Sequence, residues 1–254
     1  MLLKRADEIE KIHNAGRIVR AALDAMRDSI VPGVSTTADL ERVAAATITA
    51  AGGTSAFLGY APPGHPPYPA WTCISVNEEI IHGIPGRRKL EAGDVVSCDV
   101  GVRKDGYFAD SAWTYPVGGI SREIEKLLRV AEEALYQGIE QARAGNRVGD
   151  IGHAIERHVR RHGFSVVREM VGHGVGRQLH EPPQIPNHGS PGRGPLLQEG
   201  ATLAIEPMVM MGGHRIECLA DQWTIVTGDG RASAHYEHTV AVTANSARIL
   251  TQGD

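Results

Sequence analysis

The stretch that decides the fold is residues 94–115, which read DVVSCDVGVRKDGYFADSAWTY. Two runs rich in β-branched and aromatic residues flank Lys104-Asp105-Gly106, and such a turn between such runs predicts a β-hairpin. The strand-like runs 95–103 and 107–115 each carry one aspartate, Asp99 and Asp110, and the turn lies roughly midway between them. The hairpin is therefore expected to bring two carboxylates close together inside otherwise apolar strands.

Carboxylates inside apolar strands are consistent with only a few kinds of site. A carboxylate in a buried strand is costly unless it is paired or bound to a metal. Two facing carboxylates also repel each other unless positive charge lies between them. The residues alone leave two interpretations open: a metal-binding hairpin, or a hairpin whose aspartates lie at the surface or pair with an arginine.

Three further segments carry candidate ligands. Residues 171–180 (VGHGVGRQLH) place His173 between glycines, which permit a close approach of the backbone. In residues 203–210 (LAIEPMVM) Glu206 interrupts an apolar run, and the proline after it indicates a strand edge or a bulge. In residues 235–240 (HYEHTV) Glu237 enters another apolar strand.

Each of these segments alone is weak evidence for a metal site. A glycine-rich loop with solvated histidines, or a buried glutamate in a salt bridge, would have the same sequence pattern. Together, four carboxylates and one histidine form the ligand set that a two-metal site needs. Oxygen-rich ligation with one imidazole suits Mn, Fe, Co or Zn. Metal binding would lower the pKa of water and produce a nucleophile at neutral pH.

The rest of the chain repeats one order of elements. Two helices are predicted before the hairpin and two after it, and strands follow each pair. The helices are expected at 7–29, 37–51, 121–142 and 149–162, and the later strands at 165–170, 202–210, 215–220, 223–226 and 233–242. This order predicts two similar halves of about 120 residues, with strands inside, helices outside and a cleft between them.

Composition excludes several classes of protein. The 254 residues are 42% hydrophobic and 22% charged, as in an ordinary globular protein and unlike a disordered chain or a coiled coil. A net charge of −4 gives no electrostatic case for a nucleic-acid or anionic-membrane partner. Cys73, Cys98 and Cys218 are too few for a disulfide scaffold. Without a signal-peptide pattern at residues 1–10, a cytoplasmic protein is expected.

Taken together, the motifs resemble those of the type I methionine aminopeptidases, in the short bacterial-like form, from about residue 4 to residue 250. The matching segments are CISVNE (73–78), HGIP (82–85), DVVSCD (94–99), KDGYFAD (104–110), GHGVG (172–176), LHEPP (179–183), IEP (205–207) and EHT (237–239). The resemblance implies an α+β "pita-bread" fold with an inner antiparallel sheet and outer helices. It also implies one catalytic domain, residues 1–254, whose pseudo-symmetric halves span about 1–118 and 119–254.

The same resemblance assigns roles to individual residues. Asp99 and Asp110 would bind one metal, His173 and Glu206 the other, and Asp110 and Glu237 would bridge the two. Glu206 would act as the general base, His180 would stabilise the oxyanion, and His82 would contact the peptide. An apolar pocket for the methionine side chain would be lined by Tyr68, Cys73, Leu179 and Trp223.

The implied activity is removal of the initiator methionine from nascent polypeptides whose second residue is small. It would use two divalent ions (Co, Mn, Fe or Zn). The expected protein is a monomer that associates transiently with the ribosome and has no specific nucleic-acid or membrane partner. Two departures from the family pattern bear on specificity: Leu179 replaces a frequent phenylalanine, and the proline-rich loop 60–68 at the substrate entrance is longer.

Two alternatives stay open on the sequence. The first is a related metallopeptidase of the prolidase or aminopeptidase P type, which cleavage of an X-Pro dipeptide instead of Met-Ala-Ser would distinguish. The second is a non-catalytic binding protein on the same fold, although such proteins lose ligands and all five ligand positions are filled here.

Overall fold

The hairpin predicted from residues 94–115 is formed by β4 (Val95–Lys104) and β5 (Tyr107–Pro116) in a computed structural model that describes residues 1–253. Asp105 and Gly106 make the turn, and both have positive φ. This is the type I′ geometry that matches the twist of the flanking strands. Asp110 lies opposite Gly101, two residues from Asp99. Because side chains alternate along a strand, both carboxylates lie on one face, which confirms the prediction.

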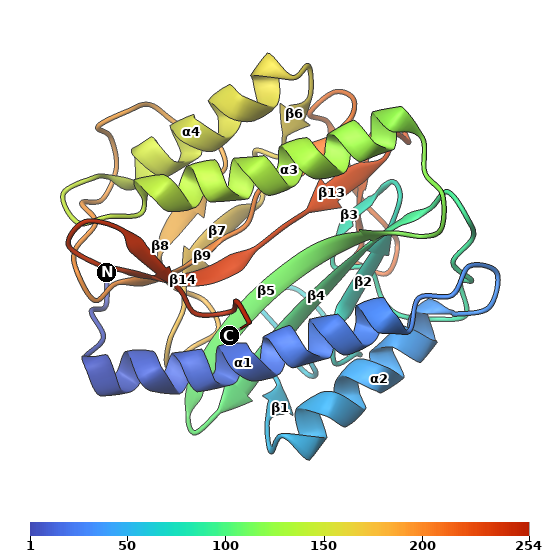
Figure 1. Cartoon of the computed structure of the whole chain (residues 1–254), viewed down its shortest axis with the longest axis horizontal. Helices are drawn as coiled ribbons and strands as arrows, with labels where there is room; N and C mark the ends of the chain where they lie inside the picture. The colour runs from blue at the N-terminus through green and yellow to red at the C-terminus, as the bar shows by residue number, and fades with distance from the viewer. Residues whose placement is uncertain (254) are drawn as a thin grey trace.

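The first helix pair covers this hairpin. Helix α1 (Ala6–Asp28) packs on β4 and β5 through apolar residues at helical spacing, among them Ile12, Val19 and Leu23, which are fully buried. Helix α2 (Thr37–Ala50) packs beside α1 and begins at a capping box between Thr36 and Asp39. Figure 1 shows both helices below the long strands β4 and β5.

The second helix pair covers the later strands in the same manner. Helix α3 (Arg122–Gln141) begins at Ser121, whose side chain accepts a hydrogen bond from the backbone of Ile124. Helix α4 (Val148–Arg161) lies along α3 and ends before Gly163, a glycine with φ of 84°. Apolar residues of both helices pack in one core with those of the strands beneath them. Figure 1 shows this pair above the strands.

Antiparallel strands form the inner layer. They are β1 (Thr54–Ser55), β2 (Cys73–Val76), β3 (Glu79–Ile81), β6 (Ser165–Val166), β7 (Val171–Gly174), β8 (Glu181–Pro186), β9 (Thr202–Ile205), β10 (Met208–Met210), β11 (Ile216–Cys218), β12 (Ile225–Thr227), β13 (Ser233–His235), β14 (His238–Val242) and β15 (Ala247–Ile249). One sheet joins β1 and β2 to the hairpin, and the largest has the order β15-β14-β9-β7-β8. All pairings are antiparallel, so the α+β architecture is as predicted.

Hydrogen bonds join β5 to β14 and to the residue before it, Glu237, where the two groups of strands meet. The Thr239 hydroxyl donates to the carbonyl of Asp110 at 2.8 Å and accepts from its N–H at 3.0 Å. The N–H of Glu237 donates to the carbonyl of Ala112 at 2.9 Å. These bonds fix the hairpin aspartates against the strand that follows Glu237. Two candidate ligands far apart in the sequence are thereby held side by side.

Some predicted elements differ from the structure. Residues 202–210 form two strands instead of one, because the chain breaks at Glu206 and Pro207. Residues 233–242 likewise break at Tyr236 and Glu237. Only Ser165–Val166 is strand in the predicted 165–170 segment. Residues 171–180, which could be a glycine-rich loop, begin with strand β7. Their glycines interrupt the alternation of side chains that identifies a strand in a sequence. The helices agree with their predicted bounds to within one residue.

The three cysteines of the chain are free thiols: Cys73 and Cys98 are buried, and Cys218 is exposed. None of the helices within residues 1–253 is both long enough and apolar enough to cross a membrane.

Gly16 is the point of closest contact between α1 and the C-terminal segment, and Gly16→Ala is expected to destabilise the protein. A Cβ at Gly16 would overlap the carbonyl of Leu250, which a hydrogen bond from the Leu250 N–H to Thr239 holds in place. Alanine favours a helix over glycine by about 1 kcal/mol, but overlap with the fixed carbonyl of Leu250 falls in the upper part of the overpacking range, about 2–3 kcal/mol. We expect a net loss of about 1–2 kcal/mol in urea unfolding. Gly119→Ala, at an open position, is the control, and equal stability of the two variants would contradict this packing argument.

Candidate metal centre and substrate cavity

The five predicted ligands converge on one point although five separate segments supply them. Asp99 lies on β4 and Asp110 on β5, and His173 lies on β7. Glu206 lies in the break between β9 and β10, and Glu237 in the break between β13 and β14. All five line one cavity of about 500 Å³. At these two breaks the chain leaves the regular strand pattern, and the side chains of Glu206 and Glu237 line the cavity.

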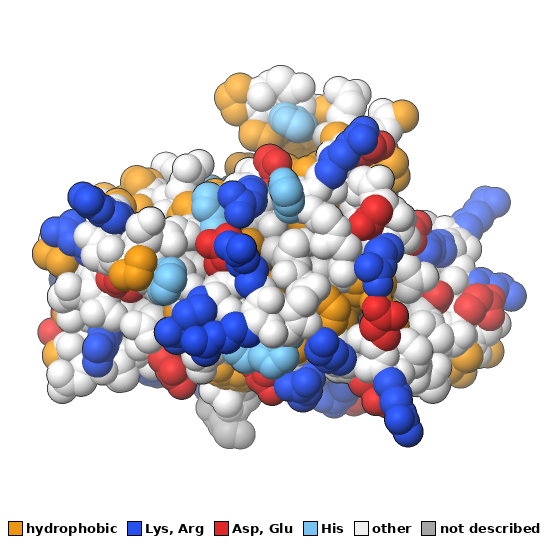
Figure 2. Space-filling view, turned by 90° about the horizontal axis from the view of Figure 1, so that it is seen from above, with side chains coloured by type: hydrophobic (Ala, Val, Ile, Leu, Met, Phe, Trp, Pro, Cys, Tyr) orange, Lys and Arg blue, Asp and Glu red, His pale blue; other side chains and the backbone are white. Residues whose placement is uncertain are grey.

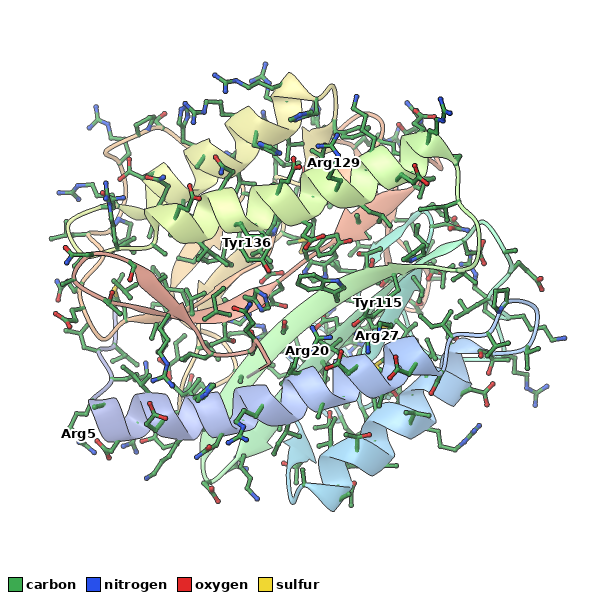
Figure 3. The ribbon with its side chains drawn as sticks, viewed as in Figure 1. Arg5, Arg20, Arg27, Tyr115, Arg129 and Tyr136 are labelled. Atoms are coloured by element: carbon green, nitrogen blue, oxygen red, sulfur yellow. The ribbon has the colours of Figure 1, made fainter. Side chains whose placement is uncertain are left out.

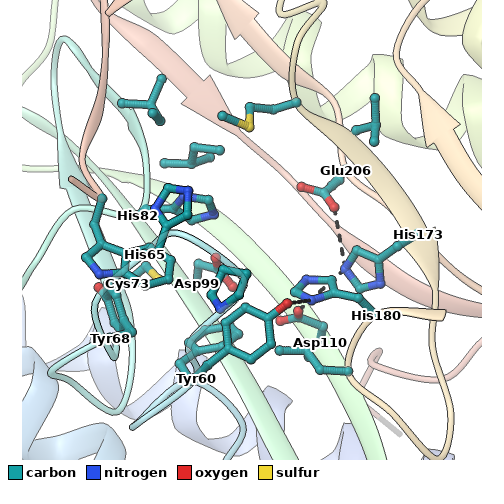
Figure 4. A pocket seen from close by; sticks show the side chains of 18 of the residues that line it. Tyr60, His65, Tyr68, Cys73, His82, Asp99, Asp110, His173, His180 and Glu206 are labelled. Atoms are coloured by element: carbon teal, nitrogen blue, oxygen red, sulfur yellow. Dashed lines mark hydrogen bonds and ion pairs between the residues drawn. The ribbon is translucent and has the colours of Figure 1, made fainter. Parts of the chain in front are cut away.

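Distances define the centre of this cluster. One ligand atom each from Asp110, His173 and Glu237 lies within 4.8 Å of the other two. The Nε2 of His173 is 3.9 Å from Asp110 Oδ2 and 3.7 Å from Glu206 Oε1. Figure 4 shows Asp99 and Asp110 on one side of the cavity and Glu206 and His173 on the other.

The carboxyl groups are in an environment that disfavours their ionised forms. Burial raises the pKa of Asp110 to about 7. Burial, and then the charge of Asp110, raises the pKa values of Asp99, Glu206 and Glu237 well above their ordinary range. Within residues 1–253, the cavity lining contains no lysine or arginine that could compensate these charges. The carboxylates of this cavity therefore lie together without a lysine or arginine in the cavity lining to balance their charge.

The histidines of the cavity are held neutral. Burial, together with the neighbouring His180, lowers the pKa of His173 to about 3. Burial lowers the pKa of His180 to about 4. Burial, and then the neighbouring His180 and His65, lower the pKa of His82 to about 4. Neutral imidazole is the form that ligates a metal or accepts a proton.

These residues fit a divalent metal. Among the described residues, Asp99 Oδ1, Asp110 Oδ1 and Glu237 Oε1 are buried oxygens without a hydrogen-bond partner. The Nδ1–H of His173 donates to the carbonyl of Gly174 at 2.9 Å, which leaves the Nε2 lone pair directed at the carboxylates. A bond of this kind at the second nitrogen is how proteins orient a metal-binding histidine. The unpartnered oxygens and this imidazole together form an oxygen-rich donor set with one nitrogen.

An apolar pocket adjoins the ligand cluster. Tyr68, Cys73, Leu179 and Trp223 form one buried cluster with Phe57 and Ala70. The Tyr68 and Trp223 rings meet edge to face, with centroids 5.1 Å apart. All four residues predicted for the methionine pocket are therefore brought together beside the carboxylates. Apolar and aromatic side chains therefore form one wall of the cavity.

The two remaining predicted residues lie at the cavity wall. His180 stacks edge to face on His173, with ring centroids 4.3 Å apart. His82 lies against Trp223 at 6.0 Å and has φ of 59°, an uncommon backbone conformation for a residue other than glycine. Both imidazoles line the cavity near the candidate ligands. Every residue expected at the site is thus placed in it.

Three contacts at the cavity were not predicted from the sequence. The Tyr60 hydroxyl lies 2.7 Å from His180 Nδ1, across 120 positions of sequence. His65 Nδ1 lies 3.1 Å from the carbonyl of Gln222, so loop 60–68 reaches across the cavity mouth. His235 Nε2, which is buried, lies 3.6 Å from Glu206 Oε2. Only His235 had a local signal, because it stands two residues before Glu237.

The chain is similar to known metallopeptidases over almost its full length. Residues 10–244 match metallopeptidase family M24. The chain is 48% identical to methionine aminopeptidase of Clostridium perfringens, over 99% of this chain and 98% of that one. It is 47% identical to methionine aminopeptidase 1 of Bacillus subtilis, over 99% of each chain.

Solved structures separate relatives from proteins that share only the fold. A methionine aminopeptidase of Thermotoga maritima superimposes with a TM-score of 0.96 at 44% identity, over the full length of both chains. A prolidase of Pyrococcus horikoshii gives a TM-score of 0.78 at 20% identity, and this chain covers 64% of it. The pita-bread fold is common to both. The chain belongs to metallopeptidase family M24 and, by its full-length relatives, to the methionine aminopeptidases.

Proposed function

We propose that this protein removes the N-terminal methionine from nascent polypeptides whose second residue is small, in a metal-dependent hydrolysis. The observation that carries the proposal is the position of the apolar pocket of Tyr68, Cys73, Leu179 and Trp223 directly beside the carboxylate cluster. A methionine side chain in this pocket would place the first peptide bond at the cluster. Contact between the free α-amino group of the substrate and the ligand cluster would restrict cleavage to the first residue.

Two divalent ions, Co, Mn, Fe or Zn, would be held by Asp99, Asp110, His173, Glu206 and Glu237. When bound, such ions polarise a carbonyl and lower the pKa of water. Ligand type does not select one ion among these four. The unpartnered buried oxygens of Asp99, Asp110 and Glu237 support this assignment.

Glu206 is assigned the proton transfers. Its carboxylate lies at the edge of the cluster, in contact with the cavity and 3.7 Å from His173. Burial raises its pKa, so that it can accept a proton from the attacking water and deliver it to the leaving amine. His235, 3.6 Å from the other carboxylate oxygen, would hold Glu206 in position.

His180 is assigned the carbonyl oxygen of the scissile bond. We assign the Tyr60 hydroxyl, 2.7 Å from Nδ1 of His180, as the donor of this hydrogen bond, which places the proton of the neutral ring on Nε2. That N–H can donate to oxygen as negative charge develops. His82, on the opposite wall beside Trp223, would contact the peptide backbone.

Selection of small second residues would be steric. Pro62 and His65 of loop 60–68 line the cavity together with His82. A bulky second side chain would meet this wall before the carbonyl reaches the cluster. The remaining expectations from the sequence accompany this proposal: one catalytic domain of pseudo-symmetric halves (1–118 and 119–254), a cytoplasmic monomer, and transient ribosome association without specific nucleic acid.

A comparison of three substrates tests the proposal. Metal-loaded protein is expected to release methionine from Met-Ala-Ser, to do so at least tenfold more slowly from Met-Leu-Ser, and to leave Ala-Pro intact. Preferential cleavage of Ala-Pro would support a prolidase-type activity instead. No cleavage of any of the three by folded, metal-loaded protein would support a binding protein.

Tyr60→Phe is expected to lower kcat about five- to tenfold with little change in KM. The substitution removes one neutral hydrogen bond to His180, worth about 1 kcal/mol, and leaves the ring in place. Steady-state kinetics on Met-Ala-Ser would measure the effect. Tyr136→Phe, on α3 outside the cavity, is the control. A change confined to KM would contradict the assignment of His180 to the transition state.

A further inference from the structure

A second cluster of metal-binding side chains lies outside the cavity, where α3 and α4 pack together. Glu133 comes from α3, and His158 and His162 come from the last turn of α4 and the residue that caps it. The two histidines are four residues apart, so they lie on one face of the helix. None of the three lines the cavity described above.

Distances in this cluster suit one ion. A ligand atom of each residue lies within 4.8 Å of the other two, and His158 Nε2 is 3.0 Å from Glu133 Oε2. The two imidazole centroids are 4.7 Å apart. Tetrahedral Zn²⁺ with bonds near 2.0–2.1 Å needs ligand atoms about 3.4 Å apart. Because all three side chains are half-buried, rotations that move their atoms by about 1 Å would close this gap.

The orientation of His162 supports ligation. Its Nδ1–H donates to the carbonyl of His158 at 3.0 Å, so Nε2 keeps its lone pair. The same arrangement, in which one nitrogen is fixed by a carbonyl and the other is free, is typical of metal-binding histidines. His158 and Glu133 share one hydrogen bond, and an ion would replace its proton.

Neighbouring cations leave the cluster accessible. Arg129 contacts Glu133 Oε1 at 2.9 Å and Oε2 at 3.2 Å, but its side chain is 55% exposed and can withdraw from Oε2 while still holding Oε1. The Lys126 ammonium is held by the carbonyl of His162, to which it donates at 2.7 Å, and lies over the ring of Phe164. Figure 3 shows Arg129 on α3, and Figure 2 shows histidines among charged side chains on the face seen from above.

We infer that Glu133, His158 and His162 form a binding site for a single zinc-like divalent ion, separate from the catalytic cavity. The ion would take one carboxylate oxygen and two imidazole nitrogens, with water completing the coordination. It would link the C-terminal end of α4 to α3. The inference does not depend on the proposed peptidase activity, since no residue is shared.

Zinc titration of the full chain, followed by equilibrium dialysis and metal analysis, tests the site. The double variant H158A/H162A is expected to bind one ion fewer per chain than the wild type, with methionine release unchanged. His153→Ala, a histidine of the same helix outside the cluster, is expected to bind as the wild type does. Glu133→Gln removes the negative charge and one of the two carboxylate oxygens, and it should weaken the site by at least the roughly tenfold effect of losing a partner of a metal ligand.

A crystal soaked in Zn²⁺ gives an independent answer. An anomalous peak within about 2.0–2.1 Å of a nitrogen from each histidine is expected. Equal stoichiometry of wild type and H158A/H162A, or no peak at the cluster while the cavity is loaded, would overturn the inference. Because the cavity is read in the same crystal, failure here is distinguishable from failure of the proposed function.

Discussion

Glu206→Gln is expected to lower methionine release from Met-Ala-Ser by about 10²–10⁴-fold, the range of a lost general acid–base catalyst. The amide keeps the size of the side chain but cannot carry the proton from water to the leaving amine. Burial and the charge of Asp110 raise the pKa of this carboxyl, which matches it to that role. Initial rates with saturating metal measure the effect.

Two controls separate catalysis from other losses. Glu169→Gln changes an exposed carboxylate at the rim of the same cavity and should leave the rate within a factor of about two. Metal content of Glu206→Gln shows whether ligation is lost as well. A variant that retains metal and more than a tenth of the wild-type rate would contradict the role assigned to Glu206.

Asp110→Asn is expected to stabilise the metal-free protein at pH 8 by about 2–4 kcal/mol while it impairs metal binding. Burial raises the pKa of Asp110 to about 7, and each pKa unit corresponds to about 1.4 kcal/mol. The folded state therefore binds more protons than the unfolded state between about pH 4 and pH 7, so stability falls as pH rises through this window. Urea unfolding at pH 5 and pH 8 measures both effects.

The comparison for this prediction is Asp105→Asn, an exposed residue in the turn of the same hairpin. It should change stability by less than about 0.5 kcal/mol. Metal-free wild type should be more stable at pH 5 than at pH 8, and Asp110→Asn should weaken this dependence. Destabilisation of the metal-free protein by Asp110→Asn at pH 8 would show that the carboxylate is compensated within the protein.

Local sequence predicted the elements whose causes are local. The turn signal at Lys104-Asp105-Gly106 predicted the hairpin and the approach of Asp99 to Asp110, and the structure adds the two-residue turn and the register of β4 with β5. Helices α1 to α4 showed periodic apolar residues and turn signals at their ends, which placed their bounds. Pro207 indicated a strand edge or a bulge beside Glu206, although the full break between β9 and β10 was not predicted.

Tertiary contacts explain what the sequence did not predict. Gly172 and Gly174 looked like loop residues, but a Cβ at Gly172 would overlap the carbonyl of Ala204, and one at Gly174 would come within 2.7 Å of the carbonyl of Pro182. The glycines therefore permit a tightly paired strand at His173. The contact between Tyr60 and His180 joins loops 120 residues apart, and neither loop carries a signal for the other.

Methionine release from Met-Ala-Ser by metal-depleted protein, before and after addition of Mn²⁺, Co²⁺ or Fe²⁺, tests the central claim most directly. We expect negligible release without metal, release after addition of at least one ion, and no release from Asp110→Asn under the same conditions. Equal release with and without metal, or none with any ion from folded protein, would contradict it.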